Sequence, residues 1–258
     1  MTAAAGQRHD RSFRWPQPKQ SSLNLALTIA ALPALPTPRA QLTADQLIAL
    51  QSRRSRVIKR AGDIVFALAV LTLGSPLYLA LGCLVKLTSR GPVFYVQQRV
   101  GRDYRGFGVI KFRTMRRDAD QVLGRILAQS PDLAEEFRND YKLRNDPRIT
   151  PLGKFLRRSS LDELPQFLNV LRGEMSVVGP RPIVRDELER YGHHMDEVLA
   201  VRPGLTGLWQ VSGRNNLSYA TRVKLDLRYA RYRNAWMDLR IIIRTIGVVL
   251  DPTDRGAY

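Results

Sequence analysis

The amino-acid sequence predicts a helix-rich α+β protein that is monotopic, meaning that it enters a membrane from one face without crossing it. Three observations lead to this fold class. No charged residue occurs in the 22 positions from Ile64 to Val85, a length typical of membrane helices. The stretch from Pro92 to Met115 reads as β structure, and much of the remaining chain has helical spacing. We therefore expect one re-entrant helical hairpin, with amphipathic helices lying in the membrane interface.

The uncharged segment is predicted to turn back because Gly74-Ser75-Pro76 interrupts it. Proline removes a backbone hydrogen bond and can kink a helix. Each arm would then have about 11 residues and a length of about 16 Å, roughly half of a ~30 Å hydrocarbon core. Positive residues mark the cytoplasmic side, and both flanks carry them: Arg53, Arg54, Arg56, Lys59 and Arg60 on one side, and Lys86, Arg90, Arg99, Arg102 and Arg105 on the other. A proline-kinked helix that spans the membrane is the alternative.

Composition divides the chain into three parts. Residues 1–52 are rich in proline and are predicted to form a disordered extension. Residues 53–90 hold the basic flank and the hairpin, and residues 91–258 form a domain at the cytoplasmic face. Strands are expected at Val93–Val96 and Phe107–Phe112. Helices are expected at about residues 118–142, 161–172, 183–199, 217–233 and 236–250.

The last of these helices carries an apolar stripe. Its members recur at helical spacing: Trp236, Leu239, Ile243, Ile246 and Leu250. Such a stripe suits a helix that lies in the membrane interface. It suits equally well an ordinary helix that packs on a protein core, and the pattern alone does not decide between the two.

Composition also restricts the partners and the chemistry. Lysine and arginine number 41 against 23 acidic residues, and the formal net charge is +18. This excess indicates an anionic partner, which is nucleic acid, an acidic membrane surface or a phosphorylated substrate. Cys83 is the only cysteine, so an intrachain disulfide and a cysteine-based zinc site are excluded.

The candidate chemistry lies between Arg157 and Pro165. Leucines recur at helical spacing from Leu161 to Leu171, and Gly173 is a suitable stop. Asp162 and Glu163 therefore lie at a helix N-terminus, which binds phosphate and keeps carboxylates ionised. Ser160 and Glu163 also match a capping box, and Asp162 alone suits an N-cap. The local pattern by itself favours the cap.

Four other stretches are rich in groups that bind phosphate. Arg181 stands between two prolines, Arg202 and Arg214 each lie beside glycine turns, and Lys111 and Arg113 belong to a strand-like segment. A guanidinium makes bidentate contacts to phosphate. Each of these residues alone is more often a surface charge. Together they suit a pyrophosphate substrate beside carboxylates, with Mg²⁺ bridging the like charges.

These residues carry a pattern that resembles the bacterial sugar transferase family of monotopic phosphoglycosyl transferases. The resemblance extends from about residue 56 to residue 250, and its motifs in order are highly specific. The matching residues are Arg60-x-x-Asp63, Ser75-Pro76, Lys111-Phe-Arg-Thr-Met115, Ser160-Leu-Asp-Glu-Leu164, Asn169-Val-Leu-Arg-Gly-Glu-Met-Ser176, Val178-Gly-Pro-Arg-Pro182 and Arg202-Pro-Gly-Leu-Thr-Gly207. Larger relatives carry several membrane helices before the catalytic region, whereas only the Pro-rich segment precedes it here.

The resemblance implies an activity. The family moves a sugar-1-phosphate from a nucleotide-diphosphate sugar to a polyprenyl phosphate and releases the nucleoside monophosphate. Asp162 would be the nucleophile and Glu163 its partner, both able to hold Mg²⁺. Arg157 and Arg181 match phosphate-binding positions, and Lys111 is a weaker match; Arg202 and Arg214 are expected to bind substrate. Ser75 and Pro76 would mark the membrane break.

The stretch Gly207–Asn215 looks closest to enzymes that start exopolysaccharide or O-antigen chains. This likeness favours UDP-galactose or UDP-glucose as donor and undecaprenyl phosphate as acceptor, at the cytoplasmic face of the bacterial inner membrane. A homo-oligomer is possible, and no nucleic-acid partner is expected. The rival hypotheses are a basic nucleic-acid-binding protein, which the net charge favours, and a membrane scaffold without catalytic activity.

Overall fold

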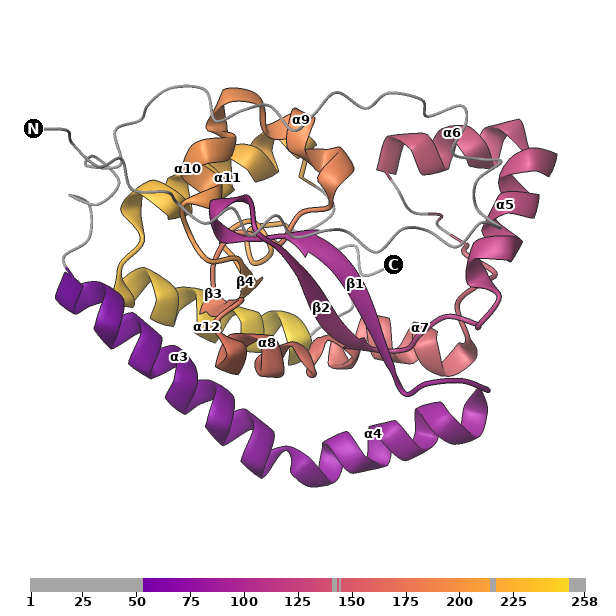
Figure 1. Ribbon diagram of the computed structural model, residues 1–258, viewed down its shortest axis with the longest axis horizontal. Helices are drawn as coiled ribbons and strands as arrows, with labels where there is room; N and C mark the ends of the chain where they lie inside the picture. The colour runs from indigo at the N-terminus through magenta and orange to yellow at the C-terminus, as the bar shows by residue number, and fades with distance from the viewer. Residues whose placement is uncertain (1–52, 141–142, 144, 214–216, 251–258) are drawn as a thin grey trace, which may run out of the picture. The chain divides into compact units, whose positions relative to one another are not determined.

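The computed structural model describes residues 53–140, 143, 145–213 and 217–250 (Figure 1). The predicted N-terminal extension, residues 1–52, lies outside this range. The described residues form many helices and two small sheets, which confirms the helix-rich α+β class. The proposed boundary between residues 90 and 91 stays a prediction.

Two consecutive helices form the first part, α3 (Arg53–Leu73) and α4 (Ser75–Thr88). They bend by 63° at Gly74, because Pro76 in the first turn of α4 cannot continue a regular helix. The bend lies where the Gly-Ser-Pro sequence predicted it. Among the described residues, no single helix is long and apolar enough to cross a membrane. Only the bent pair of α3 and α4 together has that length and composition.

The predicted strands form an antiparallel hairpin of β1 (Phe94–Val100) and β2 (Gly106–Phe112). A 3₁₀ turn, η2 (Arg102–Tyr104), connects them. The register places Tyr95 opposite Lys111, so these two side chains share one face of the hairpin. Alternate residues on the other face of β2, such as Phe112, pack into the core.

The helical stretch predicted at 118–142 is two helices in the described residues, α5 (Ala119–Gln129) and α6 (Pro131–Asp140). Pro131 has no N–H to continue α5 and instead starts α6. Helix α7 (Pro151–Arg158) was not predicted. Thr150 caps α7 by accepting a 2.9 Å hydrogen bond from the N–H of Gly153, and proline follows at the first helical position, a common start signal.

The segment predicted as a helix at 161–172 is a 3₁₀ turn, η3 (Leu161–Glu163), followed by α8 (Gln166–Arg172). Gly173 ends α8 in the left-handed conformation, with φ of 81°. The predicted stop is therefore confirmed, since glycine adopts this conformation without a Cβ clash.

The single helix predicted at 183–199 is wrong. The residues form four short helical segments: η4 (Arg185–Glu187), α9 (Leu188–Tyr191), η5 (Gly192–His194) and α10 (Met195–Leu199). Gly192, with φ of 51°, breaks the run at its centre. This segment joins β3 (Ser176–Val178) to β4 (Gly204–Thr206), which pair in parallel.

The C-terminal helices are α11 (Tyr219–Tyr232) and α12 (Ala235–Leu250), close to the predicted ranges. The four members of the apolar stripe of α12 with described side chains are exposed. Among them, Trp236 and Ile243 are 59% and 60% accessible, whereas Ile241 on another face is buried. The stripe therefore does not pack on the protein core. Its contact with lipid stays a prediction.

Helix α8 is tied to its neighbours by buried polar side chains. Asn169 is fully buried; its amide oxygen accepts from the N–H of Ile110, and its amide nitrogen donates to the carbonyl of Gly108 at 2.7 Å. The side chain thus pairs with β2 as a neighbouring strand would. Figure 1 shows α3 beside α8, where Arg60 donates to the carbonyls of Val170 and Leu171. These contacts set the position of the turn that precedes α8.

Candidate active site

Asp162 and Glu163 lie in the tight turn η3, between α7 and α8. The turn is entered through Ser160, whose φ of 58° places a residue other than glycine in the left-handed region. Such strain is found mainly at functional sites. The capping interpretation is wrong: the Ser160 side chain makes no capping hydrogen bond in this turn, and the residue at the N-cap of α8 is Pro165.

Glu163 pairs with Lys111 rather than with a helix end. The ammonium nitrogen of Lys111 lies 2.8 Å from the Oε1 atom of Glu163, and both side chains are partly buried. Strand β2 presents Lys111, and Asn169 ties β2 to α8. The same contact that joins these two elements therefore brings the cation to the carboxylate.

The two neighbouring carboxyl groups have different electrostatic environments. Burial, and then the charge of Glu163, raise the pKa of Asp162. Burial acts in the same direction on Glu163, but the charges of Lys111 and Arg181 outweigh it and lower the pKa of Glu163. Lys111 and Arg157 also favour the ionised form of Asp162. The site therefore keeps a carboxylate at Glu163 and holds Asp162 in a largely desolvated position, 7% accessible.

Arg157 approaches from the C-terminal end of α7. Its Nε atom donates a 2.9 Å hydrogen bond to the hydroxyl of Thr114, which is buried just after β2. Helix α7 can come this close because Gly153 faces the Thr114 backbone, where a Cβ atom would lie 2.0 Å from the carbonyl oxygen. Among the described residues, Nε is the only side-chain nitrogen of Arg157 with a hydrogen-bond partner, and the nearby charge of Asp162 favours the charged form of the guanidinium.

A cavity open to solvent lies beside the turn, and its empty space of about 280 Å³ includes the adjoining open solvent. Glu163 and Lys111 line one part of it, and Arg181 lines another. The remaining lining residues are Arg99, Val109, Gln166, Pro182, Gly204, Leu205 and Gln210. Three cationic side chains and one carboxylate therefore meet around a space whose walls also include apolar groups.

Sequence reasoning missed Arg99, which is 8% accessible. Its guanidinium donates to the Gln97 side chain at 2.9 Å and to the Pro182 carbonyl at 3.2 Å. Burial, and then the charge of Arg181, lower its pKa to about 10. The available signal was strand alternation, which places Arg99 on the same face of β1 as Tyr95. Gln166 and Gln210 were also missed, and no motif in the sequence distinguishes them.

The remaining predicted residues lie elsewhere. Arg202 does not line the described cavity; its Nε atom donates at 3.0 Å to the carbonyl of Gly173, at the opposite end of α8 from Asp162. Arg214 lies outside the described residues. Ser75 and Pro76 start α4, where the Ser75 hydroxyl donates to the carbonyl of Thr72. A substrate-binding role for Arg202 and Arg214 stays a prediction.

The predicted magnesium ligands fit a site that protein and substrate phosphate form together better than a site formed by the protein alone. Among the described residues, no group of three or more His, Cys, Asp or Glu side chains is arranged to hold a metal ion. Asp162 and Glu163 supply two adjacent carboxylates. Mg²⁺ is commonly bound by one or two carboxylates together with substrate phosphates and water, so this donor set is compatible with a metal that arrives with a phosphorylated ligand.

The arrangement suits nucleophilic chemistry on a phosphate. A buried carboxylate is a competent nucleophile when cations stabilise its ionised form and the charge of the phosphoryl group. Lys111 provides such a cation from β2, Arg157 from α7 and Arg181 from the loop that follows β3.

Comparisons with known proteins identify a family of sugar transferases. The family model described as bacterial sugar transferase matches residues 54–252. An uncharacterized sugar transferase of Haemophilus influenzae is 44% identical over 92% of this chain and 51% of its own length. The exopolysaccharide production protein ExoY of Rhizobium meliloti is 50% identical over 78% of this chain and 88% of its own. The undecaprenyl-phosphate galactose phosphotransferase of Salmonella typhimurium is 49% identical over 81% of this chain and 43% of its own.

The Haemophilus and Salmonella relatives are thus about twice as long as the part that this chain matches. The matched part nevertheless contains every element of the described site, from the α3–α4 pair to α12. The chain belongs to the bacterial sugar transferase family.

Proposed function

We propose that this protein transfers a hexose-1-phosphate from a UDP-sugar to undecaprenyl phosphate and releases UMP. The observation that carries the proposal is the Asp162–Glu163 turn, which stands beside a cavity lined by Lys111, Arg99 and Arg181. Family membership supports the reaction class, and the name of the Salmonella relative includes this acceptor.

The first half-reaction forms a covalent intermediate. A carboxylate oxygen of Asp162 attacks the phosphorus that bears the sugar, and the bond from that phosphorus to the bridging oxygen breaks. The electron pair of this bond leaves with UMP. Lys111, Arg157 and Arg181 offset the negative charge of the pyrophosphate during the attack. The product is an aspartyl phosphosugar.

The second half-reaction returns the enzyme to its starting state. A phosphate oxygen of undecaprenyl phosphate attacks the same phosphorus, and the bond to Asp162 breaks. The carboxylate is regenerated, and the sugar leaves on undecaprenyl diphosphate. UMP leaves before the lipid reacts, so the kinetics are expected to be ping-pong.

Mg²⁺ is the proposed cofactor, held by Asp162 and Glu163 together with substrate phosphate. When bound, it would neutralise charge on the pyrophosphate oxygens. Galactose-1-phosphate or glucose-1-phosphate is the proposed group transferred. The name of the Salmonella relative favours galactose, and that of the Rhizobium relative favours a role in exopolysaccharide production.

The proposed location is the cytoplasmic face of the bacterial inner membrane. Large apolar side chains are exposed on α3, α4 and α12, with Leu73 and Leu87 82% and 83% accessible. Soluble surfaces rarely carry so many exposed large apolar groups together. A re-entrant α3–α4 pair would place them in lipid and keep the cavity near the headgroups, where a lipid phosphate resides.

The reaction is tested by UMP release from UDP-galactose, UDP-glucose and related donors, with detergent-solubilised protein, undecaprenyl phosphate and Mg²⁺. One donor should support turnover, and Asp162→Asn should lower it by at least about 10³-fold. Asp132→Asn, at an exposed site on α6, is the matched control. Folded wild-type protein that is silent with all donors would contradict the activity and favour the scaffold hypothesis, and retained turnover in Asp162→Asn would contradict the nucleophile.

A further inference from the structure

One amide side chain in the wall of the cavity has no partner in the protein. Gln166, the first residue of α8, is 3% accessible and lines the cavity. Among the described residues, neither its amide oxygen nor its amide nitrogen has a hydrogen-bond partner. A nearly buried amide without a partner is costly. Its presence at this position is explained if a ligand in the cavity supplies the missing hydrogen bonds.

A second buried amide on the same helix shows the contrast with a structural role. Asn169 is fully buried. Its oxygen accepts a 3.0 Å hydrogen bond from the N–H of Ile110, and its nitrogen donates at 2.7 Å both to the carbonyl of Gly108 and to the carboxylate of Glu174. Every polar atom of this side chain therefore serves the packing of the protein, whereas those of Gln166 do not.

Gln166 follows the candidate nucleophile without a break in the helical conformation. Leu164 and Pro165, which separate it from the η3 turn, have helical dihedral angles, and the N–H of Leu164 donates to the carbonyl of Leu161. In such a tight turn, side chains three residues apart lie above one another. Glu163 and Gln166 accordingly line the same cavity, so the amide lies one turn from the candidate reacting carboxyl groups.

The amide differs from the cations of the cavity in what it can bind. Lys111, Arg99 and Arg181 only donate hydrogen bonds, which suits phosphate oxygens. An amide both donates and accepts, as a hydroxyl group does. Gln210 adds a second amide to the cavity lining. Its Nε2 atom lies 3.4 Å from the carbonyl of Leu205, and its Oε1 atom has no hydrogen-bond partner in the described part of the chain.

The geometry of phosphoryl transfer indicates which hydroxyl group is involved. The attacking and leaving oxygens are roughly in line, so UMP would depart on the side of the phosphorus away from Asp162. The sugar is attached to the same phosphorus at an angle to this line and would stay beside the turn. We propose that Gln166 is a specificity-determining residue, whose amide binds a hydroxyl group of the donor hexose. This inference rests on the proposed function.

The test measures binding of UDP, UDP-galactose and UDP-glucose by calorimetry, with detergent-solubilised Asp162→Asn protein and Mg²⁺ so that no sugar is transferred. Gln166→Met, added to this protein, keeps the length of the side chain and removes its hydrogen bonds. It should weaken binding of the preferred UDP-sugar about 10-fold and leave the Kd for UDP within about 2-fold. Gln129→Met, at an exposed site on α5, is the control and should change neither value.

The comparison of UDP with the UDP-sugar decides the result. Equal weakening of both would place the amide on the nucleotide or its phosphates and would overturn the inference. Unchanged Kd values for both would overturn it as well, and in either case UMP release by wild type would leave the proposed reaction intact. Selective loss of UDP-sugar binding, with no UMP release by wild type, would support the sugar contact and contradict the proposed reaction.

Thermal unfolding without ligand gives a second readout, which does not depend on the donor. Gln166→Met should leave the unfolding midpoint unchanged or higher, because the amide makes no hydrogen bond within the protein. Asn169→Leu is the matched change at a buried amide of α8 and should lower the midpoint by about 4 °C or more, because Ile110 and Gly108 lose their partner. A fall of similar size in Gln166→Met would show that Gln166 is structural and would overturn the inference.

Discussion

Asp162 and Glu163 are adjacent carboxyl groups that differ because residues from several elements surround them unequally. Lys111 forms an ion pair with Glu163 at 2.8 Å. Asp162 is 7% accessible, and the charges of Lys111 and Arg157 favour its ionised form without forming an ion pair with it in the described structure. Two like charges this close cannot both be ionised cheaply without such cations. Lys111 is therefore expected to matter more than an ordinary partly buried lysine.

Replacing Lys111 with methionine should lower the rate of UMP release by about 100-fold or more, because it removes a cation aimed at developing charge. Lys111→Arg keeps the charge with a different shape and should recover part of the activity. Lys154→Met, at an exposed site on α7, is the control. A Lys111→Met enzyme within about 3-fold of wild type would show that the ion pair with Glu163 is structural only.

The buried carboxyl group of Asp226, on α11, should make the stability of the folded protein depend on pH. Its pKa in the folded protein is raised to about 8, whereas an unfolded aspartate titrates near pH ~3.9. Between these two pH values the folded state therefore binds more protons than the unfolded state. The neutral carboxyl group makes its full contribution to stability below about pH 4, and this contribution is lost as the pH rises toward 8. The slope is at most about 1.4 kcal/mol per pH unit.

Asp226→Asn removes this titration. Thermal unfolding in detergent between pH 5 and 8 should show that the variant gains stability relative to wild type as the pH rises. Glu197→Gln, which alters a buried carboxylate on the neighbouring helix, should not reproduce this trend. Parallel curves for wild type and Asp226→Asn would mean that burial does not raise the pKa of Asp226.

At the residue scale, the sequence indicated which candidate residues lie together but not which residues surround them. Asp162, Glu163 and Lys111 lie together as expected, yet the local pattern alone favoured a helix cap. Only the combined motifs in order pointed beyond the cap. Arg99 was missed because strand alternation gives only its face of β1, whereas the pairing of β1 with β2 and the contact with Pro182 bring it to the cavity.

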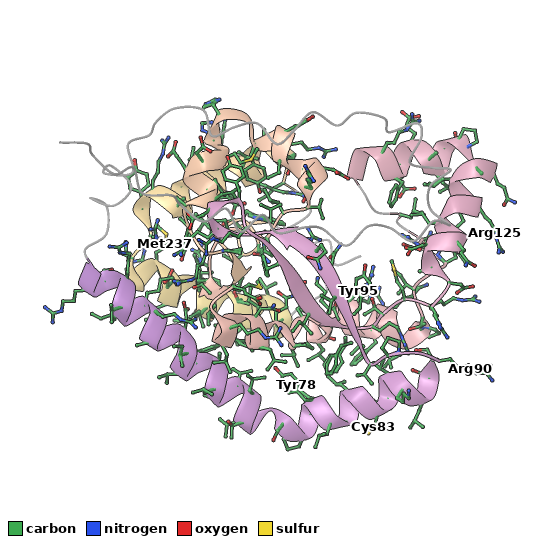
Figure 2. The ribbon with its side chains drawn as sticks, in the orientation of Figure 1. Tyr78, Cys83, Arg90, Tyr95, Arg125 and Met237 are labelled. Atoms are coloured by element: carbon green, nitrogen blue, oxygen red, sulfur yellow. The ribbon has the colours of Figure 1, made fainter. Side chains whose placement is uncertain are left out.

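At the element scale, α8 is held at both ends by the bent helix pair. Arg60 of α3 binds the carbonyls at its C-terminal end. The Tyr78 hydroxyl of α4 donates a 2.8 Å hydrogen bond to the carbonyl of Leu164, directly after the Asp162–Glu163 turn. Figure 2 labels Tyr78 on the side of α4 that faces the catalytic elements. The α3–α4 pair is thus part of the framework of the candidate active site.

Tyr78→Phe tests this link because it removes only the hydroxyl group. The rate constant kcat should fall by about 3- to 10-fold, since one hydrogen bond is worth about 0.5–1.5 kcal/mol, while the donor KM changes little. Thr88→Val is the control, because the Thr88 hydroxyl bonds within α4, to the carbonyl of Leu84. Equal kcat values for Tyr78→Phe and wild type would show that the turn is positioned without α4.

The accuracy of the predicted elements followed the strength of their local signals. The hairpin of β1 and β2, the end of α8 at Gly173 and the break at Gly74–Pro76 all have turn or breaker residues at their limits. The stretch 183–199 has helical spacing. It forms several short helical segments instead of one helix, because Gly192 interrupts it and the chain must return from β3 to β4. The pairing of β3 with β4 was not predicted, because strands of three residues are too short to show a period.

At the scale of the whole molecule, charge and apolar surface together support the proposed re-entrant topology. The arms α3 and α4 bend by 63°, and basic residues flank both ends of the pair. Arg56 and Arg90, near these ends, are both exposed. If positive charge marks the cytoplasmic side, both belong on one face of the bilayer, with the bend inside it.

This topology predicts the accessibility of single cysteines in intact cells. The native Cys83, exposed on α4 (Figure 2), is first replaced by alanine, and Arg56→Cys and Arg90→Cys are then made separately. Both cysteines should resist a membrane-impermeant maleimide applied from outside and react once the membrane is opened. Reaction at Arg90→Cys alone in intact cells would mean that the pair crosses the membrane. In that case α4 would continue to the opposite side of the membrane and would carry Tyr78 away from the turn that holds Asp162. The 2.8 Å hydrogen bond from Tyr78 to the carbonyl of Leu164 would then be absent in the membrane.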